Sequence, residues 1–170
     1  MIVPENLEDM LNRLLPNSPI TQFSIDWVLS SPRATGDSIK AIHTFLKQKG
    51  LSDDKIASHA QLLGRDPETI ERNYQRLSAL GLKDEKIATL AHLLGRDPET
   101  IERNYQRLSA LGLSDNKIAS RAELLGMNPE TIERNYQRLS ALGLKDEKIA
   151  TLAHLLGRDP ETIERNYQRL

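Results

Sequence analysis

The sequence of 170 residues has no cysteine, few aromatic residues and no long apolar run. Without cysteine, the chain can form neither a disulfide nor a cysteine-ligated zinc site, and it has no thiol nucleophile. No run approaches the roughly 20 apolar residues of a membrane-spanning helix, so we expect no membrane contact. The segment Met1–Asp9 lacks a basic stretch followed by apolar residues, so we expect no signal peptide. These absences favour a reducing, intracellular location, taken as the cytoplasm with an organelle or nucleoid left open.

Neither sign of charge dominates: 23 Lys and Arg stand against 24 Asp and Glu. This balance argues against blanket binding of polyanions, although basic side chains can still gather on one surface. The four histidines show no metal-ligand spacing, and no phosphate-binding loop or nucleophile elbow is present. We therefore expect no catalytic residue, no metal and no cofactor, and a protein that is not an enzyme.

An internal repeat organises most of the chain. Four copies begin at Leu51, Leu82, Leu113 and Leu144, a spacing of 31 residues, and the fourth is identical to the second as far as it extends. Each copy reads as two short helices, which cannot bury both faces alone, so neighbours must stack. We expect an all-α fold, an α-solenoid of two-helix repeats wound into a right-handed superhelix.

The first helix of each repeat is expected to begin near a cap and to end at a glycine. Ser52 is a suitable N-cap in the first copy. Copies two and four have lysine there, so we expect Asp84 and Asp146 to supply the cap. Gly64 then suits the left-handed conformation in which many helices end.

The second helix is predicted from an Asp-Pro pair at its start and a Gly-Leu pair at its end. Asp66 can act as N-cap and Pro67 suits the first helical position, while Gly81 terminates the helix. Two polar rows fall inside its apolar arc. We expect the asparagines to bond the backbone of the next repeat and the tyrosines to lie in the core. The rows are Asn73, Asn104, Asn135 and Asn166, and Tyr74, Tyr105, Tyr136 and Tyr167.

The first 50 residues are expected to form an N-terminal cap. Residues 20–50 align with the repeats and form a degenerate copy, and a further helix is predicted from Pro4 to Leu15. Phe23 and Trp27 are expected to cover the exposed end of the stack. The expected divisions are the cap 1–50 and the repeats 51–81, 82–112, 113–143 and 144–170, the last of them incomplete. Because this last copy has no polar outer face, we expect a shortened array or an end that associates with a second copy.

Each repeat resembles a helix-turn-helix unit. Ala60, Gly64 and Ile70 match its alanine, glycine and Ile/Val signature, and the match recurs in every copy. The phrase LSALGLKDEKIA at residues 77–88 is similar to repeats of the mitochondrial transcription termination factor family. That family stacks helical repeats into a superhelix that holds nucleic acid, so the resemblance implies a nucleic-acid partner, DNA more than RNA. The chain departs from the family where Gly64 and its equivalents replace a proline late in the first helix.

Arginine recurs at two positions on the second helix. On a helical wheel Arg72 and Arg76 point away from Ile70, and stacked repeats would align such pairs into a ladder suited to phosphates. The full set is Arg72, Arg76, Arg103, Arg107, Arg134, Arg138, Arg165 and Arg169. The alternative is a solvated face on which Glu68 pairs with Arg72.

Two further sets of residues are candidates for binding. Arg65, Arg96 and Arg158 precede the second helix, where free N–H groups favour an anion, although Met127 interrupts this row. Positions that vary between copies could select successive ligand units, as in a modular reader, or could reflect neutral drift. They are His59, Leu90, Arg121 and Leu152, and Gln61, His92, Glu123 and His154.

These patterns favour a modular protein that binds nucleic acid through a repeated arginine ladder. The alternative is a protein-interaction scaffold or a self-assembling array without a nucleic-acid ligand. A continuous basic groove would favour nucleic acid, whereas acids and arginines interleaved on every surface would favour the scaffold.

Overall fold

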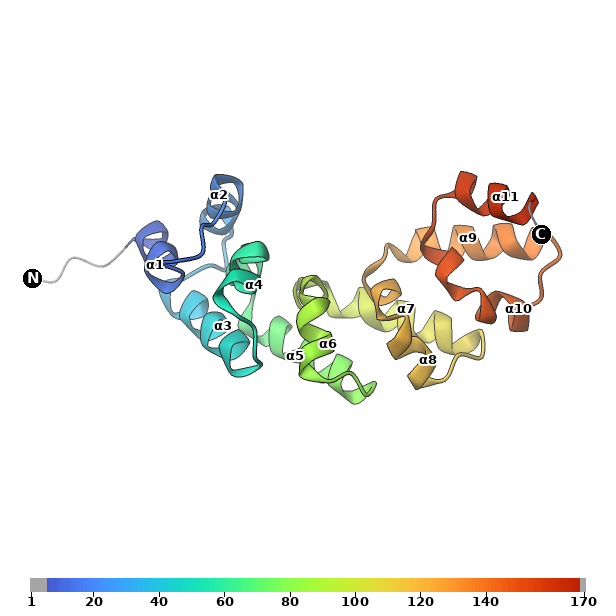
Figure 1. Ribbon diagram of the computed structural model, residues 1–170, viewed down its shortest axis with the longest axis horizontal. Coiled ribbons are helices and arrows are strands. Elements are labelled where there is room, and N and C mark those ends of the chain that lie inside the picture. Colours follow the sequence, from blue (N-terminus) through green and yellow to red (C-terminus); the bar gives the residue numbers. More distant parts are fainter. Residues whose placement is uncertain (1–5, 169–170) are drawn as a thin grey trace, which may run out of the picture. The chain divides into compact units, whose positions relative to one another are not determined.

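The computed structural model describes residues 6–168, with side chains described as far as residue 165. Helices are the only regular secondary structure in this part of the chain (Figure 1). It divides into two compact units, Met1–Gly95 and Arg96–Leu170, each of which is described by itself. None of the helices in the described residues combines the length and the apolar character that a bilayer span requires.

Both units are built from tandem helix pairs. The first unit contains α1 (Leu7–Leu14), α2 (Gln22–Ser30), α3 (Gly36–Gln48), α4 (Asp53–Ser58), α5 (Pro67–Ala79) and α6 (Asp84–Thr89), with the 3-10 helices η1 (Ala60–Gly64) and η2 (Ala91–Gly95). The second contains α7 (Pro98–Ala110), α8 (Asp115–Ser120), α9 (Pro129–Ala141), α10 (Asp146–Thr151) and α11 (Pro160–Gln168), with η3 (Ala122–Gly126) and η4 (Ala153–Gly157). The second helix of one repeat packs on the 3-10 helix of the next, as α5 does on η2, α7 on η3 and α9 on η4. The chain is therefore an α-solenoid, as the repeat predicts.

The second helix of each repeat begins and ends as its sequence predicts. Asp66 Oδ1 accepts a hydrogen bond from the Glu68 N–H at 3.0 Å, and Pro67 occupies the first turn of α5. At the other end Gly81 has a φ of 96°, and the N–H of Leu82 returns to the carbonyl of Leu77. This is the glycine-terminated helix end in which a left-handed residue satisfies the last carbonyls.

The first helix differs from its prediction. The α-helix runs for only six residues, Asp53–Ser58, and is followed by a 3-10 helix at Ala60–Gly64. Gly64 does not adopt the left-handed conformation, and a Cβ at this position would lie 2.9 Å from the Trp27 ring. The glycine is needed for close approach rather than for its backbone angle. Lys83 and Lys145 occupy the N-cap positions of α6 and α10 without a side-chain cap, so the expected caps from Asp84 and Asp146 are wrong.

Substitutions at Gly64 and Gly81 distinguish a glycine needed for close packing from one needed for its backbone conformation. Gly64→Ala is expected to lower the free energy of unfolding by about 1–3 kcal/mol, because the new methyl overlaps Trp27 and the Val28 backbone. Combining it with Trp27→Leu should recover part of that loss, as a double-mutant cycle in urea would show. Gly81→Ala has nothing within 4 Å of the new Cβ, so its cost of about 1–2 kcal/mol should come from backbone strain. Strict additivity of the Gly64 and Trp27 changes would contradict the close-approach explanation.

The asparagine row bonds the backbone of the next repeat, as expected. Asn73 Nδ2 donates to the Leu94 carbonyl at 2.9 Å, and Asn104 Nδ2 donates to the carbonyls of Leu125 and Met127 at 2.9 and 2.8 Å. Asn135 does the same with Leu156 and Arg158. The three amides are 1% exposed. They satisfy carbonyls that the 3-10 helices leave free, while the side chain of Asn166 lies outside the described residues.

The tyrosines lie at the edge of the core instead of inside it. Tyr105 and Tyr136 are half-buried, and each hydroxyl donates to the aspartate that begins the next helix, Asp115 or Asp146, at 2.7 Å. Tyr74 bonds Asp84 in the same way, and this bond raises the pKa of its hydroxyl. Tyr167 lies outside the described side chains.

The cap departs from its prediction at one aromatic residue. Helix α1 begins at Leu7, capped by Asn6, and buries Leu11. Trp27 packs against Gly64, but Phe23 is 70% exposed. The expectation that Phe23 covers the end of the stack is therefore wrong, because most of its side chain is exposed to solvent. The predicted start at Pro4 lies outside the described residues.

Candidate nucleic-acid interface

The first arginine of each repeat lies on the outer side of a second helix. Arg72 is on α5 in the first unit, and Arg103, Arg134 and Arg165 are on α7, α9 and α11 in the second. All four are exposed. Because α9 contacts both α7 and α11, the three arginines of the second unit lie at one register on neighbouring helices. We call Arg72, Arg103, Arg134 and Arg165 the arginine row.

Three members of the arginine row form no ion pair with any described residue. Within the described residues, Arg72, Arg103 and Arg134 form no ion pair, and the expected pairing of Glu68 with Arg72 is absent. Glu68 instead lies in the first turn of α5, where a carboxylate interacts favourably with the helix dipole. The first three repeats therefore each keep one guanidinium outside any ion pair with a described residue, whereas hydrogen bonds from Thr162, with a smaller contribution from Arg165, lower the pKa of Asp159.

The second arginine of each pair in the second unit contacts the following repeat. Arg107 Nε lies 2.8 Å from Glu133 Oε2, and its guanidinium lies 3.8 Å from the centre of the Tyr136 ring. Arg138 pairs with Glu164 in the same way. These arginines are half-buried, and their guanidinium groups are used in contacts between repeats instead of being available to a ligand. Arg76 also has a partner, and Arg169 lies outside the described residues.

Sequence reasoning missed these pairs between repeats, although a signal was present. A glutamate directly precedes the first arginine in every copy, as Glu133 precedes Arg134. On an isolated helix the residue four positions after Glu133 is Gln137, whose amide hydrogen-bonds the carboxylate at 3.5 Å but carries no charge, so no ion pair within the helix explains the glutamate. Only the stacking of α9 beside α7 brings it to Arg107.

A shallow recess accompanies the row in the second unit. It has a volume of about 500 Å³ and lies between α7 and the first half of α9. Its lining includes Arg103, Gln106 and Arg107 on one side and Pro129 and Glu133 on the other. With Arg107 already paired to Glu133, Arg103 is the lining cation that has no ion-pair partner among the described residues.

The arginines of the second basic row do not share one environment. Arg65 is exposed, but its guanidinium lies 4.7 Å from the centre of the Trp27 ring and approaches Gly95. Met127 takes the same place beside Gly157, which shows that an apolar side chain can fill this role. The side chain at this position therefore packs against the glycine that ends the 3-10 helix of the next repeat. Arg96 and Arg158 are also exposed, and Arg96 has an interaction partner.

The positions that vary between copies lie on the first-helix side of the repeats. His92, Arg121 and Glu123 are exposed, whereas the other five are half-buried. Those five are His59, Gln61, Leu90, Leu152 and His154. Burial lowers the pKa of His154, and the neighbouring Arg121 and Arg158 lower it further, so the imidazole is neutral at neutral pH. The variable positions thus belong to the first-helix part of each repeat, whereas the arginine row lies on the second helices.

No group of three or more His, Asp or Glu side chains within the described residues could hold a metal ion. Comparisons with protein-family models, with curated proteins and with solved structures gave no match.

Proposed function

We propose that the protein binds nucleic acid, DNA in preference to RNA, through phosphate contacts from the arginine row. The observation that carries this proposal is the recurrence of an exposed guanidinium without an ion pair at one position of successive second helices. Guanidinium groups bind phosphate oxygens in a bidentate manner, and phosphate contacts supply most of the affinity of sequence-independent binding. The preference for DNA comes from the resemblance of the repeats to helix-turn-helix units.

The ion pairs around the arginine row support an interface with fewer arginines than the sequence predicts. Glu133 and Glu164 are adjacent to the row in sequence, but Arg107 and Arg138 neutralise them. In the second unit the second arginines thus neutralise acidic side chains instead of adding phosphate contacts. The proposed interface therefore has one arginine per repeat, and the variable first-helix positions are not part of it.

The salt dependence of binding tests this proposal. With about four phosphate contacts, the logarithm of the association constant for a short DNA duplex should fall with the logarithm of salt concentration at a slope of about −3.6. Affinity should then drop about a hundredfold between about 50 and about 200 mM salt. Fluorescence anisotropy with duplex DNA, single-stranded DNA and RNA would measure it. Absence of binding at about 50 mM salt would refute the nucleic-acid function.

A protein-interaction scaffold is the second candidate. It is favoured by the alternation of arginine and glutamate between neighbouring second helices, which leaves mixed charge on that face. It is also favoured by an apolar recess in the first unit, between α3 and α5.

A further inference from the structure

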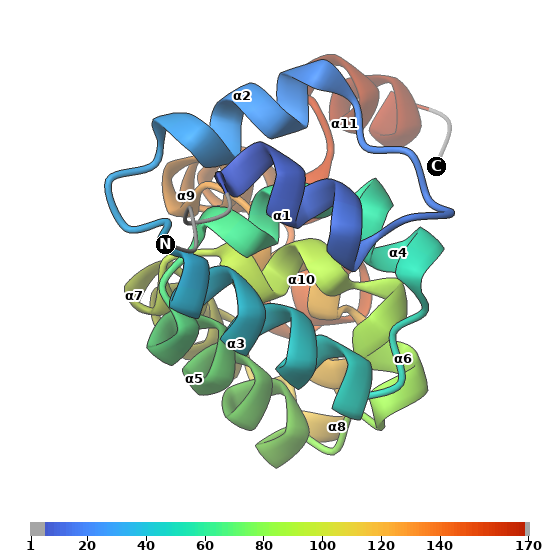
Figure 2. The same cartoon turned by 90° about the vertical axis from the view of Figure 1, so that its left-hand side faces the viewer.

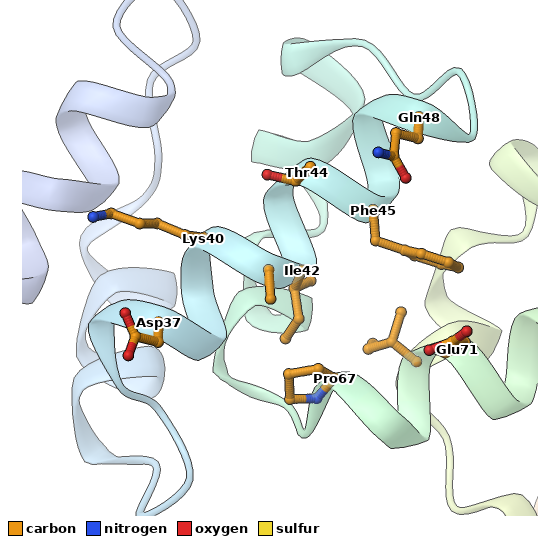
Figure 3. A pocket seen from close by; sticks show the side chains of 10 residues that line it. Asp37, Lys40, Ile42, Thr44, Phe45, Gln48, Pro67 and Glu71 are labelled. Atoms are coloured by element: carbon orange, nitrogen blue, oxygen red, sulfur yellow. The ribbon is translucent and has the colours of Figure 1, made fainter.

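The recess between α3 and α5 is the larger of the two recesses described, at about 540 Å³. The two helices lie side by side (Figure 2). Ile42 and Phe45 of α3 point toward α5, with Pro67 opposite Ile42 and Glu71 opposite Phe45 (Figure 3). Lys40 also lines the recess, but it extends to the side away from Phe45 (Figure 3). The middle of the recess is therefore apolar, with Glu71 at the rim beside Phe45 and Asp37 at the opposite rim near Lys40.

This recess and the one between α7 and α9 occupy equivalent places in the repeat. Aligned on the repeat, Ala41 corresponds to Arg103, Phe45 to Arg107 and Glu71 to Glu133. The alignment also matches Pro67 with Pro129. The carboxylate thus recurs in both recesses, whereas the cap has lost both arginines.

The second unit shows what normally fills this position. There the guanidinium of Arg107 lies between the carboxylate of Glu133 and the ring of Tyr136. In the cap, the phenyl ring of Phe45 meets the Tyr74 ring edge to face, with centres 5.4 Å apart. Lys49 Nζ lies over the Tyr74 ring at 4.5 Å.

Glu71 is left without the partner that its equivalents have. It is exposed, and it forms no ion pair with any described residue, whereas Glu133 and Glu164 each bind an arginine from the preceding repeat. Lys49 lies over the Tyr74 ring, as Arg107 lies over Tyr136, but it does not pair with Glu71. The cap junction therefore has an acidic acceptor beside an apolar surface and lacks the guanidinium.

We propose that the recess between α3 and α5 docks a partner peptide by an arginine side chain that pairs with Glu71. Aliphatic residues flanking that arginine would pack on Ala41, Phe45 and Pro67, which are exposed or half-buried. The partner chemistry follows from charge complementarity, because the two arginines of the equivalent recess are replaced by apolar residues while the acid is kept. The site uses no residue of the arginine row, although Glu71 directly precedes Arg72 in the sequence.

The probe is the peptide acetyl-Ala-Leu-Arg-Leu-Ala-amide, added to the full chain with methyl groups of isoleucine and alanine labelled for NMR. We expect saturable shifts of the Ala41, Ile42 and Ile70 methyl signals. A peptide with citrulline in place of arginine should bind about tenfold more weakly, because citrulline keeps the shape and loses the charge. Glu71→Gln should weaken the arginine peptide by about the same factor. Glu133→Gln, the same change at the filled junction, should leave binding unchanged.

Phe45→Arg gives an independent test, since it places an arginine where Arg107 lies in the second unit. We expect this chain to pair its new arginine with Glu71 and to lose the peptide-induced shifts. The proposal is overturned if the methyl signals do not move at millimolar peptide, or if citrulline and Glu71→Gln leave the affinity unchanged. Concentration-dependent self-association that Glu71→Gln abolishes would overturn the assignment of a partner peptide in favour of a second copy.

Discussion

Replacing Arg72, Arg103, Arg134 and Arg165 together by glutamine is expected to weaken binding of a DNA duplex of about 20 base pairs at least about a hundredfold at about 100 mM salt. Each arginine is exposed, and each substitution removes one charge available to a phosphate. The salt dependence should flatten at the same time, because about four fewer counterions are released. Anisotropy titrations at several salt concentrations would measure both effects.

A matched set of lysines controls for net charge. Lys55, Lys86, Lys117 and Lys148 occupy one position of the four first helices, and the last three are exposed. Their replacement by glutamine removes the same four charges from the opposite helix of each repeat. We expect this set to weaken DNA binding by less than about tenfold, because it changes only the overall electrostatic potential of the protein. If the lysine set weakens binding as much as the arginine set, the arginine row is not the interface.

Much of the repeat could be predicted from sequence because its signals are local. The Asp66-Pro67 start and the Gly81 end depend on backbone geometry within one turn, and both are confirmed. The asparagine row was also predictable, since an amide inside an apolar arc needs partners wherever it lies. In each case the prediction needed only the residue, its helix and its burial.

The missed features depend on contacts between elements. Nothing within residues 52–64 indicates that the first helix changes to a 3-10 helix at Ala60. Gly64 fits a left-handed helix end from sequence, and only the Trp27 ring reveals that it is needed for space. The pairing of Arg107 with Glu133 likewise needed the register of α7 against α9. That register could not be read from the helical wheel of one repeat.

The candidate site was predictable in part for the same reason. The helical wheel places both arginines of each pair on the outer side, because it treats the helix as isolated. Stacking then separates them, leaving Arg103 exposed and bringing Arg107 to the next repeat. Residue type and spacing identified the set, and the packing of neighbouring helices decided which members face solvent.

Asn104→Asp is expected to lower the free energy of unfolding by about 3 kcal/mol or more at neutral pH. The side chain is 1% exposed, and its Nδ2 donates to the carbonyl oxygens of Leu124, Leu125 and Met127. The substitution replaces that donor with an oxygen and buries a negative charge against three carbonyl dipoles. Urea unfolding followed by circular dichroism would give the loss, and the control Gln106→Glu, an exposed amide on the same helix, should change stability by less than about 0.5 kcal/mol.

The pH dependence of this loss identifies its cause. Burial raises the pKa of a carboxyl group in the folded state above its unfolded value of about 4. Below that value the group is protonated in both states, and its hydroxyl can donate one of the lost hydrogen bonds. As pH rises above about 4, the new carboxyl group ionises in the unfolded chain but stays protonated to a higher pH in the folded state. The loss of stability relative to the wild type should therefore grow toward neutral pH. A loss that is equal at about pH 4 and about pH 7 would show that the amide fills space between repeats without acting as their hydrogen-bond donor.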